Sequence, residues 1–150
     1  LRNAVVGFCY GRAGDPGDRE EVEAFLTTLQ EGILTKFELW LTRQPFFKQD
    51  TPFFVGDHAT APDFHIFELL EQLNLLADCN SLPNITTGAS LTHVLAFHQN
   101  FRKLSENEKY FSSAMAGAPC NNLTAVFGSL AGGRRWERGA PLPDDISGVY

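Results

Sequence analysis

The stretch from Ala61 to Ala77, APDFHIFELLEQLNLLA, constrains the fold most, because its apolar residues fall on more than one face of a helix. These residues are Phe64, Ile66, Phe67, Leu69, Leu70, Leu73 and Leu76. A helix that is apolar most of the way around is stable only when other helices cover it. Pro62 fits the first turn, where a missing N–H costs nothing. The stretch therefore predicts a central, buried helix.

Four residues just before and inside this helix form a motif: Gly56, Asp57, Thr60 and Asp63. Thr60 and Asp63 have capping-box spacing, in which the Thr60 hydroxyl accepts from the Asp63 N–H and the Asp63 carboxylate accepts from the Thr60 N–H. Gly56 and Asp57 predict the preceding turn. A catalytic carboxylate cluster is the alternative, and the structural interpretation is favoured because each side chain has a task in folding.

Two apolar patterns precede the motif. Residues 1–11 read as an apolar helix that Gly11 stops, and residues 19–43 read as one long helix that begins after Asp18 and ends before Gln44–Pro45. Apolar residues recur at threes and fours along the long helix: Val22, Leu26, Leu29, Ile33, Phe37 and Trp40. This period predicts a single apolar stripe.

Two further helices follow the central one. Ser90 is a candidate cap for the apolar period that runs through 91–104, and Ser105-x-x-Glu108 is a second capping box that opens a short helix through Met115. Because no strand alternation is convincing, we expect an all-α bundle with one core over residues 1–128. The Gly- and Pro-rich residues 129–150 predict an extended tail, which is solvated, docked across a pocket or an interaction peptide.

Charge and cysteine usage exclude several classes of function. The net charge of −6 and the pI near 5.1 argue against a nucleic-acid or anionic-membrane surface, and no apolar stretch reaches the roughly 18 residues that span a bilayer. Three widely spaced cysteines without C-x-x-C predict neither a disulfide framework nor a zinc site, and favour a reducing compartment. The four histidines have no metal-ligand spacing, so no metal site is predicted.

The motif FFVGDHATAPDF at 53–64 resembles the segment before the central helix of the glutathione S-transferase C-terminal domain. FCY at 8–10 is similar to the end of that domain's first helix in mu-class enzymes, and LTAVF at 123–127 is similar to the mu-class segment near the C-terminus. The stretch from Phe97 to Met115 resembles the region where two late helices meet. The resemblance covers residues 1–128 and is mu-like.

The resemblance implies a two-domain enzyme. In this family a thioredoxin-like N-terminal domain binds glutathione, and the helical domain forms the pocket for the hydrophobic electrophile and part of the dimer interface. We therefore expect this chain to be the helical half of a cytoplasmic, homodimeric detoxification enzyme, inactive as a fragment. Glutathione is the implied co-substrate, bound mainly by the other domain, and no further cofactor is implied.

The resemblance also implies site residues. Tyr10 falls where mu-class enzymes carry a pocket tyrosine, whose hydroxyl serves as a general acid or electrophilic group. The implied substrate-binding residues are Arg2, Asn3, Val6, Tyr10, Thr124 and Phe127. The alternative for Tyr10 is a buried tyrosine with one satisfied hydroxyl, and Val6 and Phe127 are also compatible with simple core packing.

Two other functions remain open at this point. One is a non-catalytic transferase-like assembly module, of the kind found in elongation-factor subunits and tRNA-synthetase complexes. The other is an isolated helical domain with its own ligand-binding role. Tyr10 favours the enzyme, since an assembly module needs the cap and the core but no polar group in a pocket.

Overall fold

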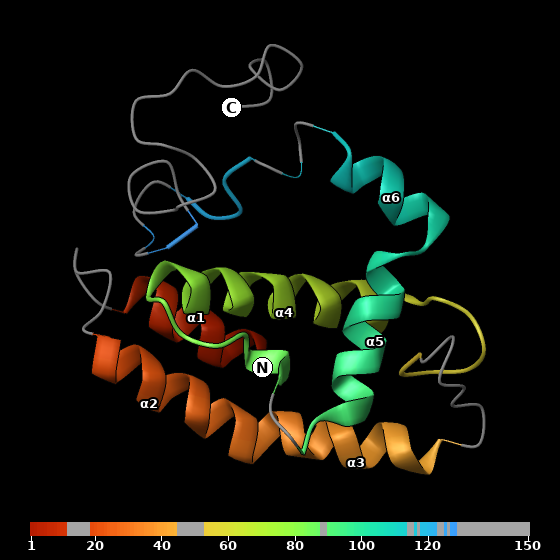
Figure 1. Ribbon diagram of the computed structural model, residues 1–150, viewed down its shortest axis with the longest axis horizontal. Helices are drawn as coiled ribbons and strands as arrows, with labels where there is room; N and C mark the ends of the chain where they lie inside the picture. Colours follow the sequence, from red (N-terminus) through yellow and green to blue (C-terminus); the bar gives the residue numbers. More distant parts are fainter. Residues whose placement is uncertain are drawn as a thin grey trace.

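The computed structural model describes residues 1–11, 19–44, 53–87, 90–113, 116, 118–122, 125 and 127–128. The elements in these ranges are all helical, which confirms the predicted all-α fold (Figure 1). They are α1 (Arg2–Tyr10), α2 (Arg19–Leu29), the π-helix η1 (Gln30–Leu34), α3 (Thr35–Arg43), α4 (Ala61–Cys79), the 3₁₀-helix η2 (Ile85–Thr87), α5 (Thr92–Arg102) and α6 (Ser105–Phe111).

Helix α4 is the central element. It contacts α1, α2, α5 and η2. In Figure 1, helices α1, α2 and α3 are seen below α4, and α6 is seen above it. Leu70, Leu73 and Leu76 are completely shielded from solvent, while Phe64 at its start keeps 48% of its surface exposed. The apolar residues on several faces of α4 thus meet several neighbours, which is how a helix apolar all round becomes stable.

The start of α4 is organised by the carboxylate of Asp63, which has no exposed surface. The capping box with Thr60 is present, and the Asp63 Oδ2 accepts from the Thr60 N–H at 2.8 Å and from the Thr60 hydroxyl at 2.5 Å. The Asp63 Oδ1 accepts from the Phe54 N–H at 2.7 Å. Because the carboxylate is itself shielded from solvent, its hydrogen-bonding capacity is directed to these protein donors and takes the place of water at the helix start.

The bond to Phe54 fixes the segment before α4 against two other helices. The Phe54 ring makes edge contacts with Phe37 of α3 at 5.2 Å and with Phe97 of α5 at 4.8 Å between ring centroids. The Trp40 indole N–H donates to the Phe54 carbonyl at 2.8 Å. Gly56 follows in the turn with a φ of +75°, a region that glycine occupies without steric cost. Asp57 lies exposed in this turn, with its Oδ1 2.9 Å from His58 Nδ1.

The predicted single helix over 19–43 is wrong in one respect, because the π-helical turn η1 interrupts its α-helical period. The Thr35 N–H and hydroxyl both donate to the Gln30 carbonyl, the hydroxyl at 2.7 Å. A π-turn inserts one residue into the period, which rotates the following turns by about 100°. The buried positions after Leu29 are therefore Leu34 and Leu41, while Trp40 of the predicted stripe is 53% exposed.

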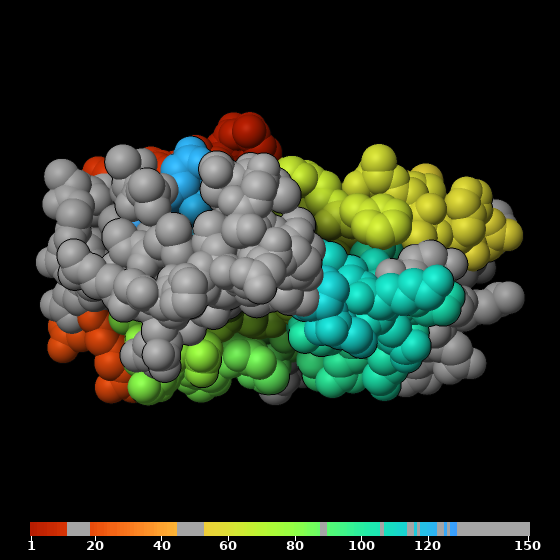
Figure 2. Space-filling view, turned by 90° about the horizontal axis from the view of Figure 1, so that it is seen from above, coloured from red at the N-terminus to blue at the C-terminus, as the bar shows by residue number. Residues whose placement is uncertain are grey.

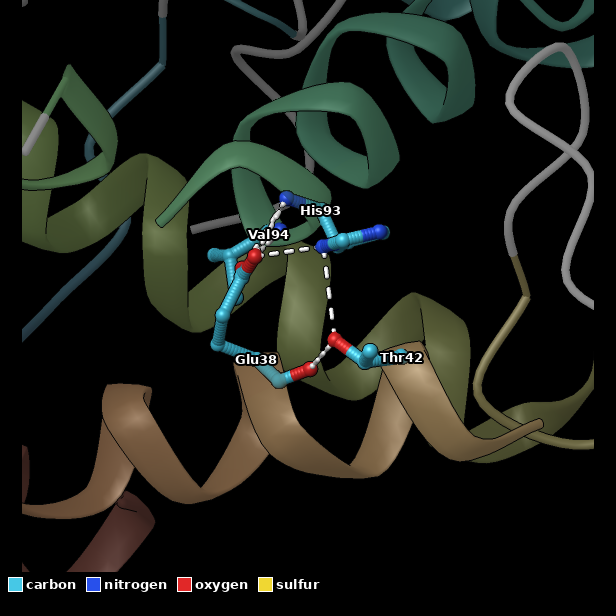
Figure 3. Close-up of polar contacts among 4 residues, drawn as sticks. All are labelled: Glu38, Thr42, His93 and Val94. Atoms are coloured by element: carbon cyan, nitrogen blue, oxygen red, sulfur yellow. Dashed lines mark hydrogen bonds and ion pairs between the residues drawn. The ribbon is translucent and has the colours of Figure 1, made fainter. Parts of the chain in front are cut away.

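Glu38 of α3 lies at the N-terminus of α5. Its carboxylate accepts from the backbone N–H groups of His93 and Val94, each at 2.9 Å, and lies 2.5 Å from His93 Nδ1 (Figure 3). The N-cap position of α5 is Leu91, which makes no capping bond with its side chain. The expectation that Ser90 caps this helix is therefore wrong, since a carboxylate from another helix takes that role.

Two other predicted boundaries change. The capping box at Ser105 is not formed as expected, because Leu104 is the N-cap of α6 and makes no side-chain cap bond. This helix ends at Phe111, whereas Met115, its predicted end, lies outside the described residues. Asp18 and the predicted tail 129–150 also lie outside them.

The buried Asp63 carboxylate predicts a large loss of stability on removal. In Asp63→Ala the N–H groups of Phe54 and Thr60 lose a buried carboxylate acceptor, which we expect to lower the free energy of unfolding by about 3 kcal/mol. Asp57→Ala, at an exposed carboxylate six residues earlier, is the control and should stay within about 0.5 kcal/mol. Urea denaturation followed by circular dichroism gives both values, and equal losses in the two variants would contradict the assignment.

Glu38 carries the second prediction. We expect Glu38→Ala to lower the free energy of unfolding by about 2 kcal/mol, because two N–H groups at a positive helix end lose a charged acceptor. Glu38→Gln keeps one acceptor oxygen and should lose less. Amide hydrogen exchange at His93 and Val94 should accelerate in Glu38→Ala and stay unchanged in Glu31→Ala, an exposed glutamate on η1. Unchanged exchange in both variants contradicts the cap.

Candidate functional site

A cavity of about 330 Å³ opens between α1 and α4. Its α1 side is formed by Arg2, Val5, Val6, Cys9 and Tyr10. These residues recur at threes and fours, so they share one face of the helix. Val5 and Cys9 are buried and form the floor, whereas Val6 and Tyr10 keep 42% and 40% of their surface exposed at the opening.

The α4 side of the cavity is formed by His65, Glu68, Leu69 and Gln72, and Asn121 closes one end. Sequence reasoning missed these residues, although a signal was present. His65, Glu68 and Gln72 stand at i, i+3 and i+7, so they place three polar side chains along one face of an otherwise apolar helix. Only the packing of α1 beside that face makes it a cavity wall.

The hydroxyl of Tyr10 accepts a hydrogen bond from the backbone N–H of Asn122 at 3.4 Å. A phenol that accepts in this way keeps its own proton for donation to another group. Asn121 and Asn122 thus lie beside α1, and Figure 2 shows part of this segment in blue next to the red of α1.

A turn closed at Gly128 holds Asn122 in place. The N–H groups of Cys120 and Asn121 both donate to the Gly128 carbonyl, at 2.8 and 3.0 Å, and the Asn121 side chain donates to the Phe127 carbonyl at 3.1 Å. Gly128 has a φ of +71°, and a Cβ added there would lie 2.4 Å from the Cys120 Sγ. Glycine is therefore required at this position by both conformation and space.

The structure brings three of the predicted substrate-binding residues together, since Arg2, Val6 and Tyr10 all line the cavity. Asn3 is exposed on α1 and is not among the lining residues. Phe127 is 2% exposed and belongs to the hydrophobic core. Thr124 lies outside the described residues. The roles of all these residues in binding stay predictions.

A second, more open hollow of about 430 Å³ lies between α4 and α5 around Glu71. Glu71 Oε1 accepts from His98 Nε2 at 2.7 Å, and its Oε2 accepts from Arg102 at 2.5 Å. Burial alone raises the pKa of Glu71, but the bonds and charges of His98 and Arg102 outweigh it and hold the pKa below its ordinary value. Because Glu71 joins the two helices through these bonds, we interpret the cluster as a structural cross-link.

Two classes of site receive no support from the described part of the chain. No group of three or more His, Cys, Asp or Glu side chains is arranged there to hold a metal ion. Of the helices in those ranges, none combines the length and apolar character that a membrane span requires.

The turn at Gly128 carries a prediction. In Gly128→Ala the new methyl group meets the Cys120 sulfur and the backbone is strained, so we expect a loss of about 2 kcal/mol and loss of the Asn122–Tyr10 bond. Gly7→Ala is the matched control, because a Cβ at Gly7 meets nothing within 4 Å. Faster amide exchange at Asn122 in the first variant alone is the expected result. Equal exchange in both variants would show that the turn does not hold Asn122.

Comparison with known proteins supplies the family. The model for the family "Glutathione S-transferase, C-terminal domain" matches residues 1–114. The matched range includes the capping box and the two helices that form the cavity, α1 and α4. Neither the comparison with curated proteins nor the comparison with solved structures found a match. The family match spans most of the chain and agrees with the all-helical fold. The chain therefore belongs to the family of glutathione S-transferase C-terminal domains.

Proposed function

We propose that this chain is the helical domain of a mu-like glutathione transferase, and that the cavity between α1 and α4 is the pocket for its electrophilic second substrate. The observation that carries the proposal is the position of Tyr10, whose half-exposed side chain lines a cavity in a domain of this family. Glutathione is the proposed co-substrate, held mainly by a thioredoxin-like domain of the full-length protein.

The chemistry of Tyr10 follows from its hydrogen bond. When a thiolate attacks an epoxide or an enone, the new S–C bond pushes an electron pair onto the substrate oxygen. A phenol that already accepts from a backbone N–H has its proton available for that oxygen. Tyr10 is thus proposed as the general acid, while Val6 and the buried Val5 offer apolar surface to the rest of the electrophile.

A homodimer is part of the proposal. Residues of α1 and α2 line an open, largely apolar groove, in which the rings of Phe8 and Phe25 stack with centroids 4.3 Å apart. Ala4, Gly7 and Ala24 beside them leave room for close approach by another helix. This groove supports assembly through α1 and α2. A role in detoxification and a cytoplasmic location are further parts of the proposal.

The test is Tyr10→Phe in the full-length protein. We expect kcat with an enone or epoxide substrate to fall by about 10- to 100-fold, because proton donation is lost, with the KM for glutathione unchanged. Tyr110→Phe, at a tyrosine of α6 outside the cavity, is the control and should keep full activity. Unchanged turnover in Tyr10→Phe would remove Tyr10 from the mechanism. A folded full-length protein without any conjugation activity would favour the assembly-module alternative.

A further inference from the structure

The α4 wall of the cavity presents hydrogen-bond acceptors without protein partners. Gln72 Nε2 donates to Glu68 Oε1 at 3.3 Å, which links the two side chains along one face of the helix. Within the described residues, the other carboxylate oxygen of Glu68 and the carbonyl oxygen of Gln72 accept no hydrogen bond from the protein. Both residues are half-buried and line the cavity, so these oxygens are the acceptors that a bound molecule meets.

The α1 wall presents the opposite character. The Arg2 guanidinium is a donor only, and within the described residues this side chain has no ion pair or hydrogen bond. Tyr10 has a hydroxyl proton available. The cavity therefore combines the acceptor oxygens of Glu68 and Gln72 on α4 with the donors of Arg2 and Tyr10 on α1, and the apolar side chains of Val5, Cys9 and Leu69 line it beside them.

A hydrocarbon in this cavity would strip water from the acceptors and replace none of their hydrogen bonds. Sites built to bond a substrate hydroxyl discriminate against analogues that lack it, because the polar groups of the site are left unpaired. The opening at Tyr10 keeps part of the cavity in contact with water, which limits the discrimination. We expect about a tenfold preference, the effect of one well-formed hydrogen bond to a charged group.

We propose that the second-substrate pocket selects electrophiles that carry a hydroxyl group in addition to the reactive carbonyl, with Glu68 and Gln72 as the residues that determine this specificity. The hydroxyl donates to Glu68 or Gln72, and the carbonyl oxygen lies towards the donors of α1. This inference rests on the proposed function, since it names the substrate class of the same cavity.

The experiment measures binding without catalysis. The 150-residue chain is titrated with cyclohexanone and with 4-hydroxycyclohexanone, two saturated probes that differ by one hydroxyl and do not alkylate Cys9. Chemical-shift changes in the amide NMR spectrum give the dissociation constants and locate the site. We expect shifts at α1 and α4 residues that line the cavity, and about tenfold tighter binding of the hydroxylated probe.

Variants test the two residues. In Glu68→Leu the preference for the hydroxylated probe should disappear, and in Gln72→Leu it should fall by several-fold. Glu68→Gln keeps the shape and one acceptor, so it should retain part of the preference even if the leucine variant does not fold. Glu31→Leu changes an exposed glutamate outside the cavity and should keep the full preference. The spectra themselves report whether each variant is folded.

The outcomes separate the inference from the function on which it rests. Equal affinity for the two probes in the unaltered chain overturns the selectivity, and an undiminished preference in both Glu68→Gln and Gln72→Leu overturns the roles of these residues. Either result leaves the pocket and the role of Tyr10 intact. Shifts confined to residues away from α1 and α4 would instead remove the pocket, and the proposed function with it.

Discussion

The rest of the structure depends on the hydrogen bonds that the carboxylate of Asp63 accepts. It is fully buried, and it joins the start of α4 to the segment before it through the N–H groups of Thr60 and Phe54. Because Phe54 packs between rings of α3 and α5, the same carboxylate also sets how those helices meet. The cavity depends on the same carboxylate, because its polar wall is one face of α4 and the start of α4 fixes the orientation of that face.

The start of α5 is also capped by a carboxylate, but this carboxylate comes from another helix. Asp63 acts on its own helix, whereas Glu38 reaches the N–H groups of His93 and Val94 from α3. Both place negative charge where a helix carries a positive partial charge and unpaired donors. The second arrangement also binds two helices together, because the side chain belongs to one and the donors to the other.

Whether an interaction could be predicted from the sequence depends on how far apart its partners lie along the chain. The capping box at Thr60 was predictable because both partners lie within three residues and follow a known spacing. The cap by Glu38 was not, since its partners lie 55 and 56 residues away. The π-turn leaves no mark in the apolar period. The predicted stripe therefore holds as far as Ile33 and Phe37, which pack against the core, and is wrong only at Trp40, which is exposed. Leu34 and Leu41 are the completely buried positions after the π-turn, and the local pattern does not single them out.

The candidate site shows the same division. The helix that carries Arg2, Val6 and Tyr10 was predicted from its apolar pattern, whereas these three site residues were identified through the family resemblance. All three line a cavity. The polar face of α4 was visible as a spacing, but a helix apolar on most sides was interpreted as wholly structural. The turn at Gly128 depends on a positive φ and a close sulfur contact, and neither can be inferred from one glycine in a sequence.

The π-turn has a consequence for how this segment tolerates substitution. The first half of the run, α2, packs on α4, and the second half, α3, packs on α5. In a straight α-helix the apolar face keeps one direction throughout, so the same face would have to fit both α4 and α5. The extra residue in η1 resets the phase between them. Residues 19–43 thus form one continuous helical segment with two apolar periods. The pattern of buried positions in the first half predicts the buried positions in the second half only after a shift by one residue.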